Sequence, residues 1–123
     1  MPDFHRPFSG FSVDNTERVR SFYTEVLGLT VTEGNGILHI DLGDDHSVIV
    51  YPKGDAHVPA TFTVLNLPTD DVSAAVRDLA DRGVEFERYD GMPQDEEGVM
   101  KGHGPDIAWF KDPAGNVFSV IAS

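Results

Sequence analysis

The stretch that decides the fold is Phe8–Val31, which reads FSGFSVDNTERVRSFYTEVLGLTV. A second stretch, Val64–Phe86, reads VLNLPTDDVSAAVRDLADRGVEF and follows the same plan. Each stretch has a short apolar strand, an Asn or Asp helix cap, an amphipathic helix, a glycine and another strand. Gly28 aligns with Gly83 after a slip of one residue. The chain therefore contains a duplicated half-domain, which implies a cavity between repeated sheets.

Hydrophobic periodicity predicts one helix in each half. The first covers 15–27, and its apolar face consists of Val19, Phe22, Tyr23, Val26 and Leu27. The second covers 71–81, with an apolar face of Val72, Ala75, Val76, Leu79 and Ala80. Residues at this spacing share one side of a helix. Asp14 and Glu17 predict a capping box at the start of the first helix, where acids also complement the helix dipole.

Four strands are expected in each half, which makes the fold α+β with two βαβββ modules. The strands cover 8–13, 29–33, 37–42 and 47–51, and then 61–67, 84–89, 106–110 and 116–121. Asp44-Asp45 and the DPAGN segment Asp112–Asn116 predict tight turns. We expect one domain over 1–123, with modules 8–51 and 61–123 joined by the linker 52–60.

Composition excludes several classes of protein. The chain has no cysteine, which rules out disulfides and thiolate chemistry. Its formal net charge of −12 argues against nucleic acid, because phosphate binding needs a basic face. The charge suits a cationic ligand or a basic partner, or it simply keeps the surface solvated. No apolar run is long enough for a membrane span and no signal peptide is visible, so we expect a cytoplasmic protein.

The doubled plan resembles the vicinal oxygen chelate superfamily, which includes glyoxalase I, bleomycin-resistance proteins, fosfomycin-resistance enzymes and extradiol dioxygenases. The segment FYTEVLGL at Phe22–Leu29 is the strongest local match, and the DPAGN turn before the last strand is another. The resemblance covers Phe8 to Ile121. It implies two βαβββ modules whose curved mixed sheets surround a cavity. Many members are dimers, so a homodimer is expected.

The resemblance also implies where metal ligands would lie, on the first and last strand of each module. Counting from the helix caps and the DPAGN turn gives Phe8, Val64 and Ser119 for those positions, and aligning the last strands of the two modules gives Val50. Three apolar side chains and one hydroxyl cannot hold a divalent ion, which needs imidazole or carboxylate donors. We therefore expect no metal and no other cofactor. A relocated metal site using His39 and Asp41 stays open as an alternative.

His39 and Asp41 alternate with Leu38, Ile40 and Leu42 along one predicted strand. Because successive side chains of a strand point to opposite faces, the pair faces the cavity or the solvent. A histidine oriented by a carboxylate can act as a general base. The simpler interpretation is a solvated strand face.

Residues 90–105 form the one long loop, which is either a binding lid or disordered. Within it, Met92 supplies soft apolar surface and His103 lies between two glycines that permit close approach to a ligand. His103 is also a candidate acid–base residue, or simply a flexible loop histidine. The loop thus adds two candidate ligand-binding residues.

Aromatic surface is concentrated near this loop, at Tyr89 and Trp109. Such rings stack on planar or cationic ligands, although part of this set must pack in the core. Asn66 lies two residues after Val64 and is expected on the same cavity face, where it would orient a ligand by hydrogen bonds. The predicted ligand-binding set also includes Phe8, His39, Val50, Val64 and Ser119.

The leading hypothesis is a metal-free small-molecule-binding protein resembling bleomycin-resistance proteins. Its ligand, cationic or aromatic, would lie in a cavity or a dimer groove. The alternative is a glyoxalase-like lyase or isomerase that uses His39, Asp41 and His103 in place of a metal. A third hypothesis is a structural or regulatory domain with a collapsed cavity.

Overall fold

The structure is a computed structural model that describes all residues, 1–123. The chain divides into two compact units, unit 1 (Met1–Val58) and unit 2 (Pro59–Ser123). Unit 1 contains β1 (Gly10–Val13), α1 (Thr16–Ser21), η1 (Phe22–Val26), β2 (Val31–Gly34), β3 (Ile37–Gly43), β4 (His46–Pro52) and η2 (Gly54–Ala56). Unit 2 contains β5 (Thr63–Thr69), α2 (Val72–Asp81), β6 (Ile107–Lys111) and β7 (Val117–Ala122).

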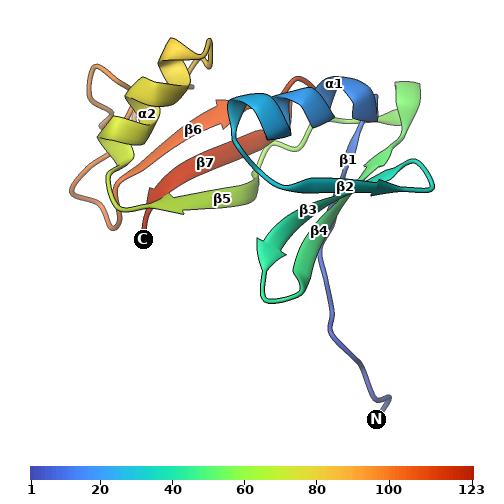
Figure 1. Ribbon diagram of the computed structural model, residues 1–123. Helices are drawn as coiled ribbons and strands as arrows, with labels where there is room; N and C mark the ends of the chain where they lie inside the picture. The colour runs from blue at the N-terminus through green and yellow to red at the C-terminus, as the bar shows by residue number, and fades with distance from the viewer. The chain divides into compact units, whose positions relative to one another are not determined.

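The sheet of unit 1 has the strand order β1–β4–β3–β2 (Figure 1). β1 pairs with β4 in parallel, and the other pairs are antiparallel. The core includes Phe11 and Val13 of β1 and side chains from α1, η1 and the inner strands: Val19, Tyr23, Leu38, Ile40, Val48 and Val50, all of them buried. Apolar residues on one helix face and one sheet face thus bury each other.

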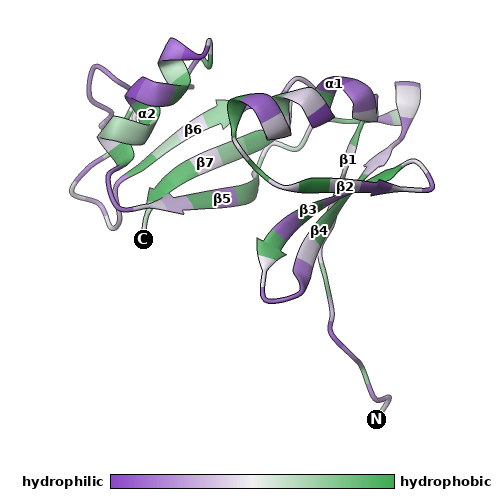
Figure 2. Ribbon diagram, viewed as in Figure 1, coloured by the Kyte–Doolittle hydropathy of each residue, from purple (hydrophilic) through white to green (hydrophobic).

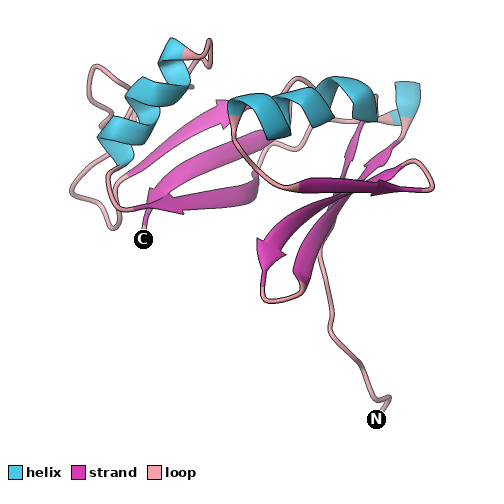
Figure 3. Ribbon diagram, viewed as in Figure 1, coloured by secondary structure: helices cyan, strands magenta, loops and turns pink.

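The first helix differs from the expected single α-helix over 15–27. α1 ends at Ser21 and continues directly into η1, a π-helical turn over Phe22–Val26. The two form one unbroken helix in Figure 3. The Leu27 N–H donates to the Phe22 carbonyl, five residues earlier, at 3.1 Å. The helix then ends at Gly28, whose φ of +71° is left-handed, so the predicted stop is confirmed. The wide turn holds one more residue than an α-helical turn would.

The start of this helix also corrects the sequence-based interpretation. Asn15, not Asp14, is the N-cap: its side chain accepts a hydrogen bond from the Glu17 N–H at 2.8 Å. Asp14 instead forms an ion pair with Arg18 at 3.2 Å. An Asn at this place can satisfy a free N–H group of the first turn as well as an Asp can, so the two neighbours could not be distinguished by type.

The sheet of unit 2 has the order β5–β7–β6, again with a parallel pair and an antiparallel pair. α2 begins at its predicted cap Asp71, whose side chain accepts from the Ala74 N–H at 3.0 Å. Phe110 packs against Phe86 and Phe118 with ring centroids 5.7 and 5.6 Å apart. β7 is largely apolar along its length (Figure 2), in keeping with four consecutive buried residues. The expected α+β class with two mixed sheets is therefore confirmed.

The strand expected over 84–89 is reduced to one antiparallel bridge, between Phe86 and Phe110. The Glu87 N–H still donates to the Trp109 carbonyl at 2.7 Å, but the ladder stops there. The side chain of Gln94 takes over the next backbone groups, because its Nε2 donates to the Glu87 carbonyl and its Oε1 accepts from the Tyr89 N–H. Hydrogen bonds from the Gln94 side chain thus take the place of the strand pairing that was expected for this segment.

The DPAGN turn between β6 and β7 is fixed by a buried carboxylate. Asp112 is 4% exposed, and its Oδ1 accepts from the N–H groups of Ala114 at 3.0 Å and Asn116 at 2.9 Å. Gly115 has a φ of +85°, and a Cβ there would lie 3.1 Å from Pro59. The predicted turn is confirmed. The corresponding turn of unit 1 uses Asp44 and Asp45, both at positive φ. None of the helices is both long and apolar enough to cross a membrane.

We expect Asp112→Ala to lower the free energy of unfolding by about 2–3 kcal/mol, because two buried N–H groups lose their acceptor. Urea denaturation measures this change. Asp81→Ala, at an exposed site near the end of α2, serves as the control and should stay within about 0.5 kcal/mol of the wild type. Equal stability of Asp112→Ala and Asp81→Ala would contradict the role given to the carboxylate.

Candidate functional site

Each sheet has one face covered by its helix and one face turned away from it. In β3, Leu38 and Ile40 are fully buried on the helix side, and His39 and Asp41 alternate onto the other side. The structure therefore brings these two candidate residues to one face of unit 1, as the alternation predicts.

A hollow of about 280 Å³ opens on this face of unit 1 at the β3–β4 hairpin. Its lining residues are polar: Thr30, Thr32, His39, Asp41, Asp45, His46 and Ser47. Strand register explains the grouping, because Thr32 lies opposite His39 and Ser47 lies opposite Asp41. Sequence reasoning missed the hydroxyl residues. The signal that could have found them was the strand pairing implied by the tight turns at Asn35-Gly36 and Asp44-Asp45.

The equivalent face of unit 2 carries three of the predicted residues in one row across the sheet. Asn66, Ser119 and Trp109 lie opposite one another on β5, β7 and β6. The Ser119 hydroxyl is fully buried and donates to the Asn66 Oδ1 at 2.5 Å. This bond fixes the carboxamide oxygen of Asn66 and leaves its NH₂ group available as a donor. Trp109 is half-buried at the other end of the row.

Tyr89 extends the row by an aromatic contact. Its ring meets Trp109 edge-on, with centroids 5.5 Å apart. Burial raises the pKa of Tyr89, and the nearby Glu87 carboxylate raises it further, although Lys111 partly offsets the effect. The phenol therefore stays protonated at neutral pH and can donate a hydrogen bond. The pair forms an aromatic wall with a polar tip.

A second hollow, of about 230 Å³, lies beside this wall in unit 2. It is lined by Pro59, Ala60, Thr61, Tyr89, Lys111, Gly115 and Val117. The ammonium of Lys111 pairs with Glu87 at 3.2 Å, which neutralises its charge locally. Most lining residues of this hollow are thus apolar, and its polar side-chain groups are one hydroxyl, one phenol and one paired ammonium.

The structural repeat differs by one position from the alignment made on sequence. Asn66 pairs with Ser119 in unit 2, and the equivalent pair in unit 1 is Gly10 with Ile49. The sequence alignment had matched Ser119 with Val50, but Val50 is fully buried on the helix side of its sheet. The turn before the last strand is shorter in unit 1 than the DPAGN turn of unit 2. Aligning the two last strands by sequence alone therefore shifts the register by one residue.

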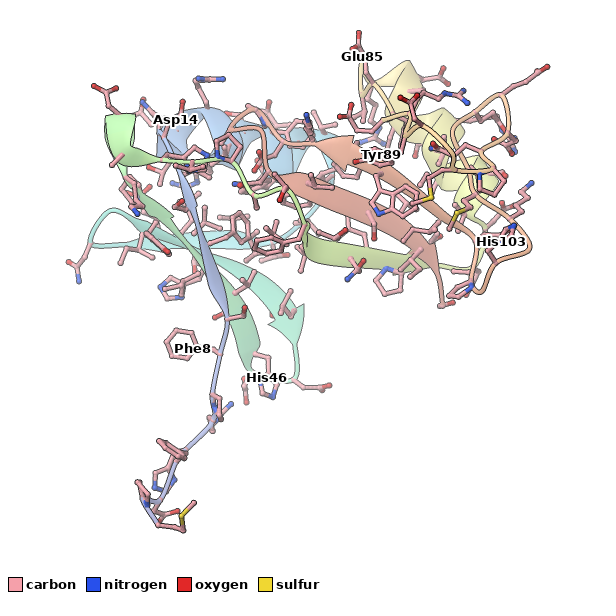
Figure 4. All side chains as sticks on the ribbon, turned by 180° about the vertical axis from the view of Figure 1, so that it is seen from behind. Phe8, Asp14, His46, Glu85, Tyr89 and His103 are labelled. Carbon is pink, nitrogen blue, oxygen red and sulfur yellow. The ribbon has the colours of Figure 1, made fainter.

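Two other predicted positions lie outside the paired row. Phe8 precedes β1 and is 70% exposed, and its side chain projects from the N-terminal segment (Figure 4). Val64 lies at a register shift between Thr63 and Leu65, which is the signature of a β-bulge. The ligand-binding roles given to Phe8, Val50 and Val64 remain predictions.

The remaining two candidates belong to the connection between α2 and β6. Met92 is 45% exposed, and its N–H donates to the Tyr89 carbonyl in a tight turn at 3.1 Å. His103 is exposed between Gly102 and Gly104, both at positive φ (Figure 4). Met92 is therefore near Tyr89 along the chain, whereas no contact links His103 to another candidate.

The chain offers no evident metal centre. No group of three or more His, Asp or Glu side chains is arranged so that it could hold an ion. The donors of the row in unit 2 are a carboxamide and a hydroxyl already bonded to each other. The relocated site considered for His39 and Asp41 lacks a third ligand of this kind. The residues present do not fit the metal of the resembled enzymes.

The long connection is ordered by side-chain hydrogen bonds over 94–100. Asp95 Oδ1 accepts from the N–H groups of Glu97 and Val99, both at 2.9 Å, and Val99 is fully buried. Burial by itself would raise the pKa of Asp95, but these two N–H groups and the Lys101 ammonium outweigh it and hold the pKa below its ordinary value of 3.8. The sequence left open whether the loop is a binding lid or disordered, and disorder does not describe residues 94–100.

Duplicated modules, each with a helix on one sheet face and an open opposite face, define the class of two-module α+β folds found in glyoxalases. The chain belongs to the Glyoxalase/Bleomycin resistance protein/Dioxygenase superfamily, whose family model matches residues 9–120. The resemblance seen in the sequence is thereby confirmed.

Solved structures support this assignment. TnmS3, described as an antibiotic binding protein from Streptomyces sp. CB03234, is 26% identical, with 96% of each chain covered and a TM-score of 0.64. A glyoxalase/bleomycin resistance protein from the same organism is 27% identical, with 94% of this chain and 99% of the other covered and a TM-score of 0.60.

A lactoylglutathione lyase from Agrobacterium tumefaciens shows the fold alone. It is 17% identical over 99% of this chain and 96% of its own, with a TM-score of 0.66. A search of the curated proteins finds no match. These comparisons therefore show the fold and the family of the chain, and they do not identify its ligand.

The carboxylate of Asp95 should make stability depend on pH. Its folded-state pKa is depressed, so its contribution is present above the unfolded pKa and is lost as pH falls through the folded one. The difference in free energy of unfolding between the wild type and Asp95→Asn should therefore be largest near neutral pH and shrink in acid. Urea denaturation at a series of pH values measures it.

Asp90→Asn, on an exposed part of the same connection, is the matched control. Its difference from the wild type should not vary with pH in this way. A pH-independent difference for Asp95→Asn would show that the ionised form of the side chain contributes nothing.

Proposed function

We propose that the protein binds a small aromatic molecule on the open face of unit 2, without a metal. The observation that carries this proposal is the row in which Trp109 is half-buried, meets Tyr89 edge-on, and shares its sheet face with Asn66 and Ser119. A site of this kind needs apolar walls and a few fixed polar groups. The indole and phenol supply the walls, and the bonded carboxamide supplies a fixed hydrogen-bonding group.

The polar groups of this row favour binding over unspecific adsorption. Because Ser119 holds the Asn66 oxygen, the orientation of the carboxamide is set before a ligand arrives. A ligand that accepts a hydrogen bond beside its ring would meet the Asn66 NH₂ group or the Tyr89 O–H. The raised pKa of Tyr89 keeps that donor protonated.

The comparisons support the same proposal. The Streptomyces protein that is 26% identical over nearly its whole length is described as antibiotic binding. We extend that description to this chain as sequestration of an antibiotic-like aromatic compound. The role of Met92, at the start of the connection after Tyr89, would be additional apolar contact with the ligand.

The lyase or isomerase alternative has less support from the geometry. His39 and Asp41 line one hollow of unit 1, which suits an acid–base pair. His103, the third residue of that hypothesis, is exposed on a connection of unit 2. An assay of methylglyoxal with common thiols distinguishes the two functions. Turnover lost in His39→Ala would favour the enzyme.

Trp109 is the only tryptophan of the chain, so its fluorescence reports on this site. We expect bleomycin or the planar antibiotic doxorubicin to quench it saturably and to raise the melting temperature, since a ligand of the folded state stabilises that state. Calorimetry should show about tenfold weaker binding to Trp109→Leu, a loss of roughly 1.4 kcal/mol. Asn66→Ala should also weaken binding.

Phe62→Leu is the matched control for this experiment, because it removes an aromatic ring from unit 2 that is 69% exposed and outside the row. It should bind as the wild type does. Saturable binding that is equally strong in Trp109→Leu would place the ligand elsewhere, and no quenching by either antibiotic would leave the proposal without support.

We also propose that the protein forms a homodimer. β1 lies at an edge of its sheet, and Phe4 and Phe8 on the segment before it are 78% and 70% exposed. Exposed edges and apolar residues of this kind favour association. Sedimentation equilibrium should give twice the monomer mass of 13.5 kDa, and Phe8→Ser should weaken the dimer. A monomer at every concentration tested would contradict this.

A further inference from the structure

We propose that the hollow at the β3–β4 hairpin of unit 1 is a separate binding site for a small hydroxylated ammonium ion, such as a protonated amino sugar. This site goes beyond the proposed function, because its residues all belong to unit 1 and none takes part in the aromatic row of unit 2. The chemistry of its lining differs as well: it has no aromatic ring other than imidazole.

The two carboxylates of the hollow form no ion pair with the chain. Asp41 and Asp45 both line it, and neither takes part in any ion pair of the structure, although seven other pairs are present. Asp41 uses only Oδ1, which accepts from the Gly43 N–H at 2.8 Å. This bond fixes the carboxylate at the bulge of the hairpin and leaves Oδ2 available to a cation.

Hydroxyl and imidazole groups surround the two carboxylates. Thr30, Thr32 and Ser47 each offer a hydroxyl that can donate or accept, and their side chains form no other hydrogen bond in the structure. The imidazole rings of His39 and His46 add nitrogen atoms that can form hydrogen bonds with a ligand. A ligand with an ammonium group and several hydroxyls matches this set, whereas an anion would face two carboxylates.

The rim of the hollow already receives a cation from the chain itself. Arg6, in the segment before β1, donates from its guanidinium to the Asp45 carbonyl oxygen at 3.1 Å. Arg6 is exposed and makes no ion pair, so the rim carbonyl is the partner that holds it. A guanidinium at this place would compete with an incoming ammonium ion by charge repulsion.

The size of the hollow limits the ligand. At about 280 Å³ it lies near the lower end of small-molecule pockets, which suits one sugar-sized ring and not a large drug. A bare divalent ion fits less well, because no three His, Asp or Glu side chains are arranged to hold one.

The test is a titration of the full chain with glucosamine, slightly below neutral pH so that the amine of the sugar is protonated, followed by the imidazole signals of its five histidines in NMR spectra. We expect saturable shifts of the His39 and His46 signals, with His57 and His103 unmoved as internal controls. N-Acetylglucosamine has the same ring without the charge and should cause no shift. Equal shifts with both sugars, or none with glucosamine, would overturn the proposal.

Two variants make the test specific. Asp41→Asn should weaken glucosamine binding about fivefold, the effect of losing one partly exposed charge pair. Asp44→Asn is the matched control, since Asp44 is in the same turn but does not line the hollow. Arg6→Ala should strengthen binding, because it removes the competing positive charge. Equal affinity of Asp41→Asn and Asp44→Asn would overturn the proposal.

The fluorescence experiment on Trp109 separates this site from the proposed function. Asp41→Asn should leave the quenching of Trp109 by doxorubicin unchanged, and Trp109→Leu should leave the glucosamine shifts unchanged. Tight stoichiometric binding of zinc or manganese, with the same histidine signals shifted, would replace the ammonium site by a metal site.

Discussion

In both units, the first strand pairs in parallel with the last strand of the same unit, β1 with β4 and β5 with β7. A parallel pair needs a crossover, and in each unit the helix that follows the first strand is part of that crossover and lies against one sheet face. The opposite face is left without a helix. Every candidate residue of the two open faces owes its position to this pairing, because the register decides which side chains point away from the helix.

The repeat also shows how one scaffold carries two chemistries. Structurally equivalent positions hold His39 and Trp109, and likewise Asp41 and Lys111. One face therefore combines imidazole with unpaired carboxylates, and the other combines aromatic rings with an ammonium that Glu87 neutralises. Most side chains on the open faces, unlike the buried Ser119, do not contribute to the packed core, so they could diverge between the modules while the buried residues kept their pattern.

Much of the fold could be predicted from the sequence because it rests on local signals. Helix periodicity, the Asp71 cap, the glycine stops and the DPAGN turn each act over a few residues. The strand over 84–89 could not be predicted correctly, because it is the side chain of Gln94 that replaces its ladder. The predicted register of the open faces was wrong for a similar reason. Turns of unequal length and the bulge at Val64 shift the strand pairing by one residue without any change in the hydrophobic pattern of the sequence.

The π-helical turn over Phe22–Val26 accounts for the slip of one residue between the two sequence repeats. From its cap to its terminal glycine, the first helix has one residue more than the second, and the wide turn is where that residue is accommodated. An extra residue in an α-helix would rotate everything after it by about 100°. A single wide turn confines that rotation, so β2 still enters the sheet in register. The first module thus accommodates its extra residue within a helix and not in a loop.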